Sequence, residues 1–549
     1  MHPRHLQPAG QCAPVHRGSV NVVRHDNGAQ RDERDDGTVS QAVVDGVDVS
    51  NLALNLAATA RRIPDQAATI TDVGTMSYAE LDAESSRFAT LLHRKGIGAG
   101  DRVAVMLPNI AAVPISYYGI WRLGAIVVPM NPLLKAREVQ FYLSNTAAKA
   151  VFSSPGFSEA AAEGAYAAGS EPWVIDDAEL AWLTKDLPEF GEPVGRADSD
   201  TAVVLHTSGT TGRPKGAELT HGSLSTNQEV VVRTLLKLTD TDVVLACLPL
   251  FHVFGMTCAM NAAIAAGAAL SLMPRFDPVT ALERIRRDRV TVLEAVPTMY
   301  SALLAVADQF PPEATATLRT CVSGGAALPM QVLDDFEKAF GAVILEGYGL
   351  SETSPAVSFN HPDAERRPGS IGTPIEGVQM RLVDDDGNEV GPGTPGEIQV
   401  KGPNVMKGYW NLPDATQTAI KDGWFCTGDI GRVDEDGYYY VVDRKKELII
   451  RGGYNVYPRE VEEALHEHPA VAQVVVIGMP HDSLGEEVGA AVVLKNGASA
   501  DPEELRNFVK QRVAAYKYPR RIWLVDSLPT GPTGKLLRRE VKPPPLEEA

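Results

Sequence analysis

Short apolar runs rich in β-branched residues recur between about residues 100 and 293 of this 549-residue chain, where they alternate with segments of helical periodicity. The clearest runs are Arg102–Leu107, Ala125–Pro129, Ala150–Phe152, Thr201–Leu205, Asp242–Ala246 and Val290–Leu293. Strands that alternate with helices form parallel sheets with helices packed on both faces. The pattern therefore predicts an α/β fold, and the length predicts two to four compact units.

After about Ile371 the pattern changes to short alternating strands separated by many glycines and prolines. This change predicts a small antiparallel barrel or sheet near residues 375–442. A fresh unit follows the charged tetrad Asp443–Lys446, and its predicted elements are helices from Pro458 and Pro502 and strands Val471–Ile477, Val488–Leu494 and Ile522–Val525. We predict an N-terminal domain over residues 46–442, a hinge over 443–446 and a small α+β domain over 447–549.

Regular structure is expected to begin near Val49. Residues 1–45 are rich in His, Arg, Asp, Gly and Gln and show no sustained apolar period, which predicts a disordered extension. The segment Met76–Leu81 is predicted to open a helix. In it Ser77 is the N-cap and Glu80, three residues on, is its capping-box partner.

The overall charge limits the partners that the chain can have. It carries 51 Lys and Arg against 70 Asp and Glu, a net charge of −19, which argues against nucleic acid as a partner. The five cysteines are scattered without a C-x-x-C pair, which fits neither a zinc site nor a disulfide framework. That cysteine usage is typical of a reducing compartment and predicts a cytoplasmic protein. The sequence leaves the oligomeric state open.

The stretch Val253–Met273 is nearly free of charge, so it needs an explanation. It is rich in Ala and Gly and contains Asn261, which makes it far less hydrophobic than a membrane-spanning segment. We interpret it as a buried helix–turn–strand. The sequence predicts no integral membrane span and, at most, a weak association with a membrane surface.

The segment with the strongest chemical signal is Thr207–Gly216, which reads Thr-Ser-Gly-Thr-Thr-Gly-Arg-Pro-Lys-Gly directly after an apolar strand. Small hydroxyl side chains and glycines leave backbone N–H groups free to hold phosphate oxygens, and Lys215 adds a positive charge. It is not a Walker A loop, because Pro214 stands where the second glycine belongs and Gly216 follows the lysine. We predict a phosphate-binding loop.

This loop resembles the signature of the adenylate-forming enzymes, the superfamily of acyl-CoA synthetases, aryl-CoA ligases, luciferases and peptide-synthetase adenylation domains. Motifs similar to the others of that family follow in the same order, at Pro249–Gly255, Ser323–Leu328, Glu346–Thr353, Trp424–Asp429, Asp443–Asn455 and Pro529–Lys535. The resemblance covers residues 50–540 and is strongest to fatty-acid acyl-CoA synthetases. It implies two helix-covered sheets plus a small β-barrel in the large domain, and a mobile C-terminal domain.

The resemblance implies which residues bind ATP and AMP: Thr207, Ser208, Gly209, Thr210, Thr211, Gly212, Lys215, Gly325, Ala326, Glu346, Gly347, Tyr348, Gly349, Ser351, Asp429 and Arg444. Chemistry supports several of these roles. Tyr348 offers an aromatic face to adenine, with glycines on both sides that admit close backbone approach. Asp429 can accept hydrogen bonds from both ribose hydroxyls.

Three residues are predicted to be catalytic by the same resemblance. Lys535 would bridge the reacting carboxylate and the α-phosphate, where its charge stabilises the charge that develops in the attack. Glu352 is suited to Mg²⁺, which prefers carboxylate and phosphate oxygens, and it is the predicted metal ligand. His252 would lie beside the acyl carboxylate.

A second reaction step is implied, in which coenzyme A attacks the acyl-adenylate. In the family the C-terminal domain rotates about a hinge residue, which corresponds to Lys446 here. The rotation would remove Lys535 and bring in the predicted CoA-binding residues Gly452, Gly453 and Tyr454. Some relatives have a lysine where this chain has Ile450, so the CoA phosphate contacts stay open.

The acid substrate is predicted from the residues expected to line the acyl pocket, chiefly Phe251, Phe254, Met256 and Val296. They are apolar, and no charged group is expected there to meet the ammonium of an amino acid. A medium- or long-chain fatty acid is the first prediction, and an aryl or cinnamate-type acid is the alternative. A stand-alone adenylation domain is disfavoured, and a serine hydrolase is excluded because no G-x-S-x-G motif occurs.

Overall fold

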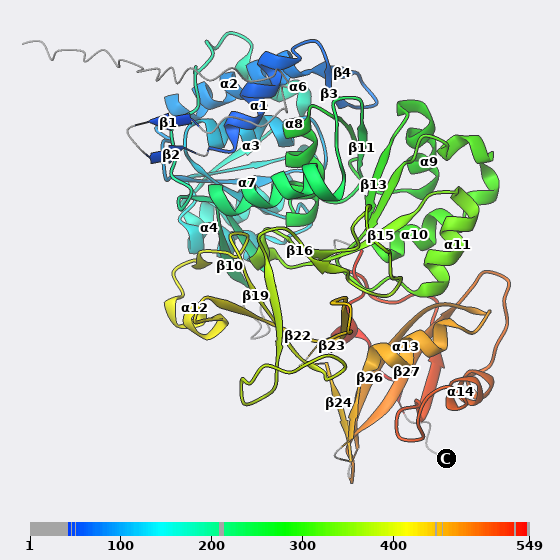
Figure 1. Cartoon of the computed structure of the whole chain (residues 1–549). Helices are drawn as coiled ribbons and strands as arrows, with labels where there is room; N and C mark the ends of the chain where they lie inside the picture. The colour runs from blue at the N-terminus through cyan, green and yellow to red at the C-terminus, as the bar shows by residue number, and fades with distance from the viewer. Residues whose placement is uncertain are drawn as a thin grey trace, which may run out of the picture. The chain divides into compact units, whose positions relative to one another are not determined.

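The computed structural model describes residues 42–44, 47–49, 51–207, 214–444, 447–452, 454–481, 483–531 and 534–545. The predicted extension 1–45 thus lies outside the described residues apart from the short strand β1 (Ala42–Val44), which pairs with β2 (Val47–Val49). Two residues of the predicted hinge, 445 and 446, also lie outside them. Figure 1 shows the elements in chain order.

The first large sheet has seven strands in the order β20-β10-β9-β6-β5-β7-β8. The strands are β5 (Arg102–Met106), β6 (Ile126–Pro129), β7 (Ala150–Ser153), β8 (Glu171–Val174), β9 (Thr201–Thr207), β10 (Lys215–Thr220) and β20 (Gly408–Tyr409). The five strands from β9 to β8 are parallel, as the sequence predicts. The outer strands β10 and β20 are antiparallel.

Helices cover this sheet on both faces. Along β5, Val103 and Val105 join one core and Ala104 and Met106 join another, as strand geometry requires. The helices are α1 (Ala53–Arg62), α2 (Tyr78–Arg94), α3 (Ala112–Arg122), α4 (Ala136–Thr146), α5 (Ser158–Ala168) and α6 (Asp177–Thr184). The predicted capping box at the start of α2 is confirmed, since Ser77 and Glu80 bond each other's backbone N–H groups.

The second large sheet has nine strands in the order β17-β16-β15-β14-β13-β11-β12-β3-β4. The strands are β3 (Ala67–Ile70), β4 (Thr75–Ser77), β11 (Val243–Ala246), β12 (Ala269–Leu272), β13 (Val292–Ala295), β14 (Thr320–Ser323), β15 (Ile344–Gly349), β16 (Ala356–Phe359) and β17 (Thr373–Pro374). Its central strands, from β15 to β3, are parallel.

This sheet also has a helical layer on each face. One face packs on α9 (Pro278–Asp288), α10 (Pro297–Leu304) and α11 (Met330–Phe340), which lie together in Figure 1. The other face shares a core with the first sheet, and the helical segments there are α7 (His221–Val230), η2 (Val231–Leu235), the π-helical η3 (Phe254–Asn261) and α8 (Ala262–Ala266). The short helices are η1 (Pro155–Phe157), η4 (Ala307–Gln309), η5 (Pro312–Thr315), η6 (Ser351–Thr353) and η7 (Arg538–Glu540).

The uncharged stretch 253–273 forms η3, α8 and β12, which confirms the predicted helix–turn–strand. Residues 256–264 are all buried against the shared core. Of the helices in the described part of the chain, none has the length and apolar character that crossing a bilayer requires.

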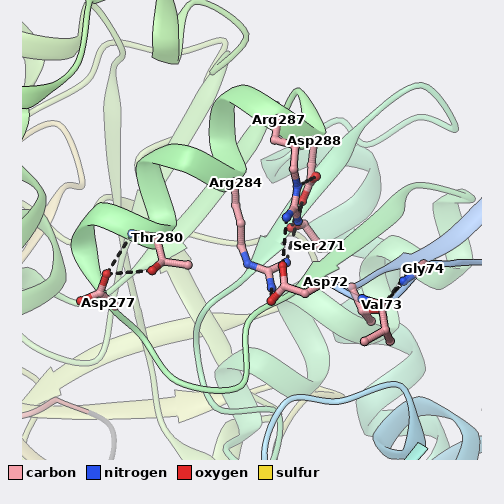
Figure 2. Close-up of polar contacts among 10 residues, drawn as sticks. Asp72, Val73, Gly74, Ser271, Asp277, Thr280, Arg284, Arg287 and Asp288 are labelled. Atoms are coloured by element: carbon pink, nitrogen blue, oxygen red, sulfur yellow. Dashed lines mark hydrogen bonds and ion pairs between the residues drawn. The ribbon is translucent and has the colours of Figure 1, made fainter.

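An ionic cluster holds α9 to the turn between β3 and β4 (Figure 2). Arg284 and Arg287 both donate to the carboxylate of Asp72 in that turn, and Arg287 also pairs with Asp288. Asp288 in turn accepts from the hydroxyl of Ser271 on β12 at 2.6 Å. The Arg284 side chain is only 2% exposed, so its charge depends on these carboxylates.

Two smaller sheets complete the described chain. The first is antiparallel and contains β18 (Gln379–Val383), β19 (Gly396–Lys401), β21 (Ile420–Lys421), β22 (Trp424–Val433) and β23 (Tyr439–Arg444), with α12 (Pro413–Ala419) beside it. The second contains β24 (Ile449–Arg451), β25 (Tyr454–Val456), β26 (Val471–His481), β27 (Gly485–Leu494) and β28 (Arg521–Leu524), packed on α13 (Pro458–His466) and α14 (Pro502–Lys510). The predicted fold class is therefore confirmed.

Candidate active site

One cavity of about 1760 Å³ collects most of the predicted site residues. The predicted residues that line it are Thr207, Lys215, Phe251, His252, Phe254, Val296, Gly325, Ala326, Glu346, Gly347, Tyr348, Gly349, Ser351, Glu352, Asp429 and Lys535. Many of them stand at or just beyond the carboxyl ends of the parallel strands β9, β13, β14 and β15. Ligands of open α/β sheets bind at that edge, because the loops there converge on one crevice.

Some predicted site residues fall elsewhere. Ser208, Gly209, Thr210, Thr211, Gly212, Lys446 and Gly453 lie outside the described residues, as does the side chain of Arg444. Gly452 and Tyr454 do not line the cavity, and Tyr454 is 60% exposed and stacks on Tyr516.

The prediction for Met256 does not match this structure. Met256 is fully buried in the shared core and does not line the cavity. Phe254 and Cys258, which stand four positions apart on η3, line it instead. Side chains at that spacing share one helix face, and the side chain two positions along points away from it.

Tyr348 and Asp429 are brought together from two different sheets. The Tyr348 hydroxyl donates to Asp429 Oδ2 at 2.6 Å, linking β15 to β22. The glycines on both sides of Tyr348 are required by the packing of the strands. A Cβ at Gly349 would meet the Pro355 carbonyl oxygen at 2.1 Å. At Gly347 it would meet the Phe359 ring at 2.7 Å. These glycines let β16 pair closely with β15, and so set the position of the Tyr348 ring.

Glu352 lies on η6, which follows β15 of the second sheet. Its side chain contacts two strands of the first sheet, β9 and β20. Its Oε1 accepts from the Tyr409 hydroxyl at 3.0 Å and from Thr207 Oγ1 at 3.4 Å. Lys215 Nζ lies 4.9 Å from the centre of the Tyr409 ring. The two residues that flank the predicted phosphate loop, Thr207 and Lys215, are therefore held beside this carboxylate.

Glu346 and His252 are both buried and both have shifted pKa values. Burial raises the pKa of Glu346 to about 7, while its carboxylate accepts the Gly369 N–H at 2.8 Å. Burial and the nearby charge of Lys535 lower the pKa of His252 to about 4. Because Nδ1 of His252 accepts the Phe254 N–H at 3.3 Å, the neutral ring carries its proton on Nε2.

Lys535 projects from a tight turn in the C-terminal unit. The turn is closed by the Gly531 N–H bonded to the Lys535 carbonyl at 2.7 Å, and by the Gly534 N–H bonded to the Gly531 carbonyl at 2.9 Å. The Thr298 hydroxyl on α10 donates to the Gly534 carbonyl at 3.0 Å. Gly534 has a φ of +76°, a conformation that favours glycine. These contacts place Lys535 in the cavity with His252.

Arg538 follows this turn and anchors the chain just after Lys535 to β26 and α13. Its guanidinium contacts Glu447 Oε2 at 3.2 Å and Glu462 Oε1 at 3.0 Å, and donates to the Val476 carbonyl at 2.8 Å. The sequence analysis missed this residue. Its only sequence signal is a basic pair three residues after the predicted catalytic lysine.

Tyr409 and Glu294 also line the cavity without having been predicted from the sequence. Tyr409 enters the site because β20 pairs with β10, which no local pattern reveals. Glu294 lines the cavity from β13 and was not among the residues expected there. An acidic residue within an apolar strand pattern was the available signal, and the sequence alone does not say which face it occupies.

Comparison with known proteins matches two family models to the chain. The model described as AMP-binding enzyme matches residues 56–410, and the AMP-binding enzyme C-terminal domain matches residues 460–535. The first covers the two large sheets. The second covers most of the unit that carries Lys535.

Individual relatives are similar over most of their length. A long-chain-fatty-acid–CoA ligase of Bacillus subtilis (strain 168) is 37% identical over 527 residues, which cover 88% of this chain and 92% of the relative. A feruloyl-CoA synthase of an Amycolatopsis species is 38% identical over 486 residues, covering 88% and 96%. The solved structure of ATP-bound MatB from Rhodopseudomonas palustris superimposes with a TM-score of 0.84 at 34% identity, covering 90% of this chain and 98% of that one.

Proposed function

Because this chain belongs to the AMP-binding enzyme family, we propose that its cavity joins a hydrophobic carboxylic acid to AMP and then passes the acyl group to coenzyme A. At the level of reaction class the chain is an AMP-forming acid–thiol ligase, an acyl-CoA synthetase, with ATP and coenzyme A as its substrates. The observation that carries the residue roles is the meeting of Lys535, His252, Tyr348, Glu352 and Asp429 in one cavity.

In the first step the acid attacks the α-phosphate of ATP and pyrophosphate leaves. Adenine stacks on Tyr348, and the ribose hydroxyls bond Asp429, which Tyr348 already orients. Lys535 bridges the attacking carboxylate and the α-phosphate, so it both aligns them and offsets the developing negative charge. His252 is neutral, so its Nε2–H can donate a hydrogen bond to the acyl carboxylate without adding a second positive charge beside Lys535.

The oxygens around Glu352 fit a magnesium ion. Mg²⁺ binds through one or two carboxylates together with substrate phosphates and keeps several waters. Glu352, with the Thr207 hydroxyl beside it, supplies such a hard donor set at the predicted phosphate loop. The ion would neutralise charge on the leaving pyrophosphate.

In the second step the thiol of coenzyme A attacks the acyl carbon and AMP leaves. We propose that rotation about Lys446 withdraws the Lys535 turn from the cavity and brings in the loop of Gly452, Gly453 and Tyr454. The position of Gly452 and Tyr454 away from the cavity agrees with an arrangement poised for the first step. Thr298 and the Gly534 carbonyl would separate during the rotation.

The acid is proposed to be a medium- or long-chain fatty acid. Apolar side chains from the shared helical layer extend the cavity beyond the reacting centre, and they are Val231, Leu235, Leu236, Phe251, Val253, Phe254 and Cys258. A wall of this kind accommodates an extended alkyl chain through apolar burial, at roughly 0.8 kcal/mol per CH₂. The long-chain-fatty-acid–CoA ligase relative supports the same assignment.

An aryl or cinnamate-type acid is the second candidate. Phe251 and Phe254 lie on the cavity wall, where their rings can pack on the ring of such a substrate. The relative named feruloyl-CoA synthase favours this alternative.

Pyrophosphate release from ATP tests the proposal. With laurate we expect rapid release that needs no coenzyme A to begin, and with cinnamate a slower release. Glycine or phenylalanine should give none. Release with amino acids and not with laurate or cinnamate would contradict the proposed substrate class.

A further inference from the structure

Glu294 is a buried carboxyl group in the cavity for which the proposed reaction has no use. It lines the cavity, the residue is 1% exposed, and neither carboxylate oxygen has a hydrogen-bond partner among the described residues. We propose that Glu294 is a specificity-determining residue of the acyl pocket that binds an uncharged hydroxyl group carried on the acyl chain of the substrate. This inference rests on the proposed function and narrows its substrate class.

The register of the second sheet sets the direction of this side chain. Along β13, Val292 belongs to the core shared with η3 and α8, whereas Leu293 and Ala295 belong to the core under α9 and α11. Alternation places Glu294 on the same face as Val292. Its neighbour on β14 is Val322, which also belongs to the shared core.

Residues of η3 line the same cavity. Cys258 on η3 lines the same cavity, and its pKa is raised first by burial and second by the nearby Glu294 carboxylate. Phe254 lies one helical turn before Cys258 on the same wall. Glu294 on the sheet and the apolar side chains of η3 therefore line one cavity, which the proposed function assigns to the acyl chain.

The charge state of Glu294 selects the chemistry that it can recognise. Burial raises its pKa to about 8, so the carboxyl is mostly neutral at pH 7 and offers one O–H donor and one carbonyl acceptor. A plain alkyl or aryl group would leave both unsatisfied, which is unfavourable in a buried site. A hydroxyl group donates and accepts at the same time, so it satisfies both.

Two kinds of acid carry such a hydroxyl. One is a hydroxylated fatty acid, and the other is a hydroxycinnamic acid. The chemistry that they share is a hydroxyl group on the acyl part of the acid, and the arms of the experiment separate the two sources.

The experiment compares pyrophosphate release with two matched pairs, ω-hydroxylaurate against laurate and para-hydroxycinnamate against cinnamate. In the wild type, kcat/KM for the hydroxylated member of one pair should exceed that of its plain partner by about tenfold or more, the factor that the net contribution of one hydrogen bond provides. Glu294→Leu should reduce this ratio by about tenfold, while Glu294→Gln, which keeps a donor and an acceptor, should retain most of it.

Two controls separate recognition from folding. Glu294→Leu removes a buried carboxyl without a protein partner, so its melting temperature should equal or exceed that of the wild type. Val292→Ala alters the same strand face away from the cavity lining. It should lower the melting temperature and leave the substrate ratio unchanged.

The outcomes distinguish this inference from the proposed function. If the ratio of kcat/KM for the hydroxylated acid to that for its plain partner is the same in the wild type and in Glu294→Leu, the proposed role of Glu294 is overturned. The proposed function would stand in that case. A preference for ω-aminolaurate would overturn the role of Glu294 too, since an ammonium requires the ionised carboxylate. No release with any of the four acids would count against the proposed function.

Discussion

Lys535 and His252 show at the residue scale how a cation and a ring share one buried site. The charge of Lys535 and the loss of solvent both disfavour a proton on the second ring nitrogen of His252. In the proposed reaction the neutral His252 ring would donate a hydrogen bond, and Lys535 would supply the positive charge for the α-phosphate.

Replacing Lys535 should separate the two half-reactions. In Lys535→Ala we expect pyrophosphate release to fall about 10²–10³-fold, because a charge aimed at the α-phosphate is lost. Thioester formation from a preformed acyl-adenylate should change less than about tenfold. Rapid-quench measurement of each half-reaction checks this. Lys542 is an exposed lysine in the same segment, so Lys542→Ala is the control and should leave both rates unaltered. Equal losses in the two steps of Lys535→Ala would contradict the role assigned to Lys535.

The buried carboxyls predict how stability depends on pH. Burial raises the pKa of Glu294 to about 8 and that of Glu346 to about 7, so between about pH 4.5 and 8 the folded state holds protons that the unfolded state releases. Their contribution to the free energy of unfolding is therefore complete below pH 4.5 and declines as the pH rises to 8.

Glu294→Gln should make that decline shallower by up to roughly 1.4 kcal/mol per pH unit, the limit for one proton. Urea unfolding from pH 5 to 8 measures the slope. A slope unaltered by Glu294→Gln would show that this carboxyl is already ionised in the folded protein at low pH.

At the scale of single elements, α9 illustrates a helix whose position is set by charge as well as by apolar packing. Its buried face contributes Ala281, Leu282 and Ile285 to the core under the second sheet. The guanidinium of Arg284 lies on that face too, and it reaches Asp72 in the β3–β4 turn (Figure 2). The helix and the turn therefore stabilise each other.

Removing the carboxylate of Asp72 should destabilise the protein. Among the described residues, Asp72→Ala leaves the buried charge of Arg284 with Asp288, 3.9 Å away, as its one carboxylate partner. Since Asp72 is itself 62% exposed, we expect a loss of about 1–2 kcal/mol in the free energy of unfolding and not the full value of a buried pair. Chemical denaturation measures it. Glu283→Ala, on the exposed face of α9, is the control, and it should change the free energy of unfolding by no more than about 0.5 kcal/mol. An equally small change in Asp72→Ala would show that the ion pair contributes little.

At the scale of the whole molecule, the active site depends on segments from the large sheets and from the C-terminal unit. The Thr298–Gly534 hydrogen bond and the turn that carries Lys535 join them on one side of the cavity. A reaction that first needs Lys535 and then needs a different loop requires these contacts to break and reform. The proposed hinge at Lys446 is where the backbone rotation would occur.

Restricting the hinge should stop the second step alone. Lys446→Pro constrains the φ angle of that residue and removes its N–H. We therefore expect adenylation at a near wild-type rate. Thioester formation should fall by about 100-fold or more, since misplacement of the reacting groups by about 1 Å costs that much. Lys446→Ala keeps backbone freedom and should preserve both steps. Measurement of pyrophosphate release and of acyl-CoA formation in the same samples decides, and a parallel loss of both in Lys446→Pro would contradict the hinge.

The sequence by itself determined the local and periodic features. Alternating strands and helices, the Ser77–Glu80 capping box and the buried segment 253–273 all follow from spacing and residue type, because such features depend on neighbours along the chain. The order of the nucleotide motifs likewise identified the residues that meet in the cavity, and most of them line it.

Only the tertiary structure decided which side chains face one another across the sheets. Tyr409 reaches Glu352 through the pairing of β20 with β10, and Met256 points into the core while Cys258 lines the pocket. Glu294 lines the cavity from the same face of β13 as Val292, beside Val322 on the paired strand β14. These relations depend on strand order and register between segments far apart in the chain, and local propensity carries no information about either.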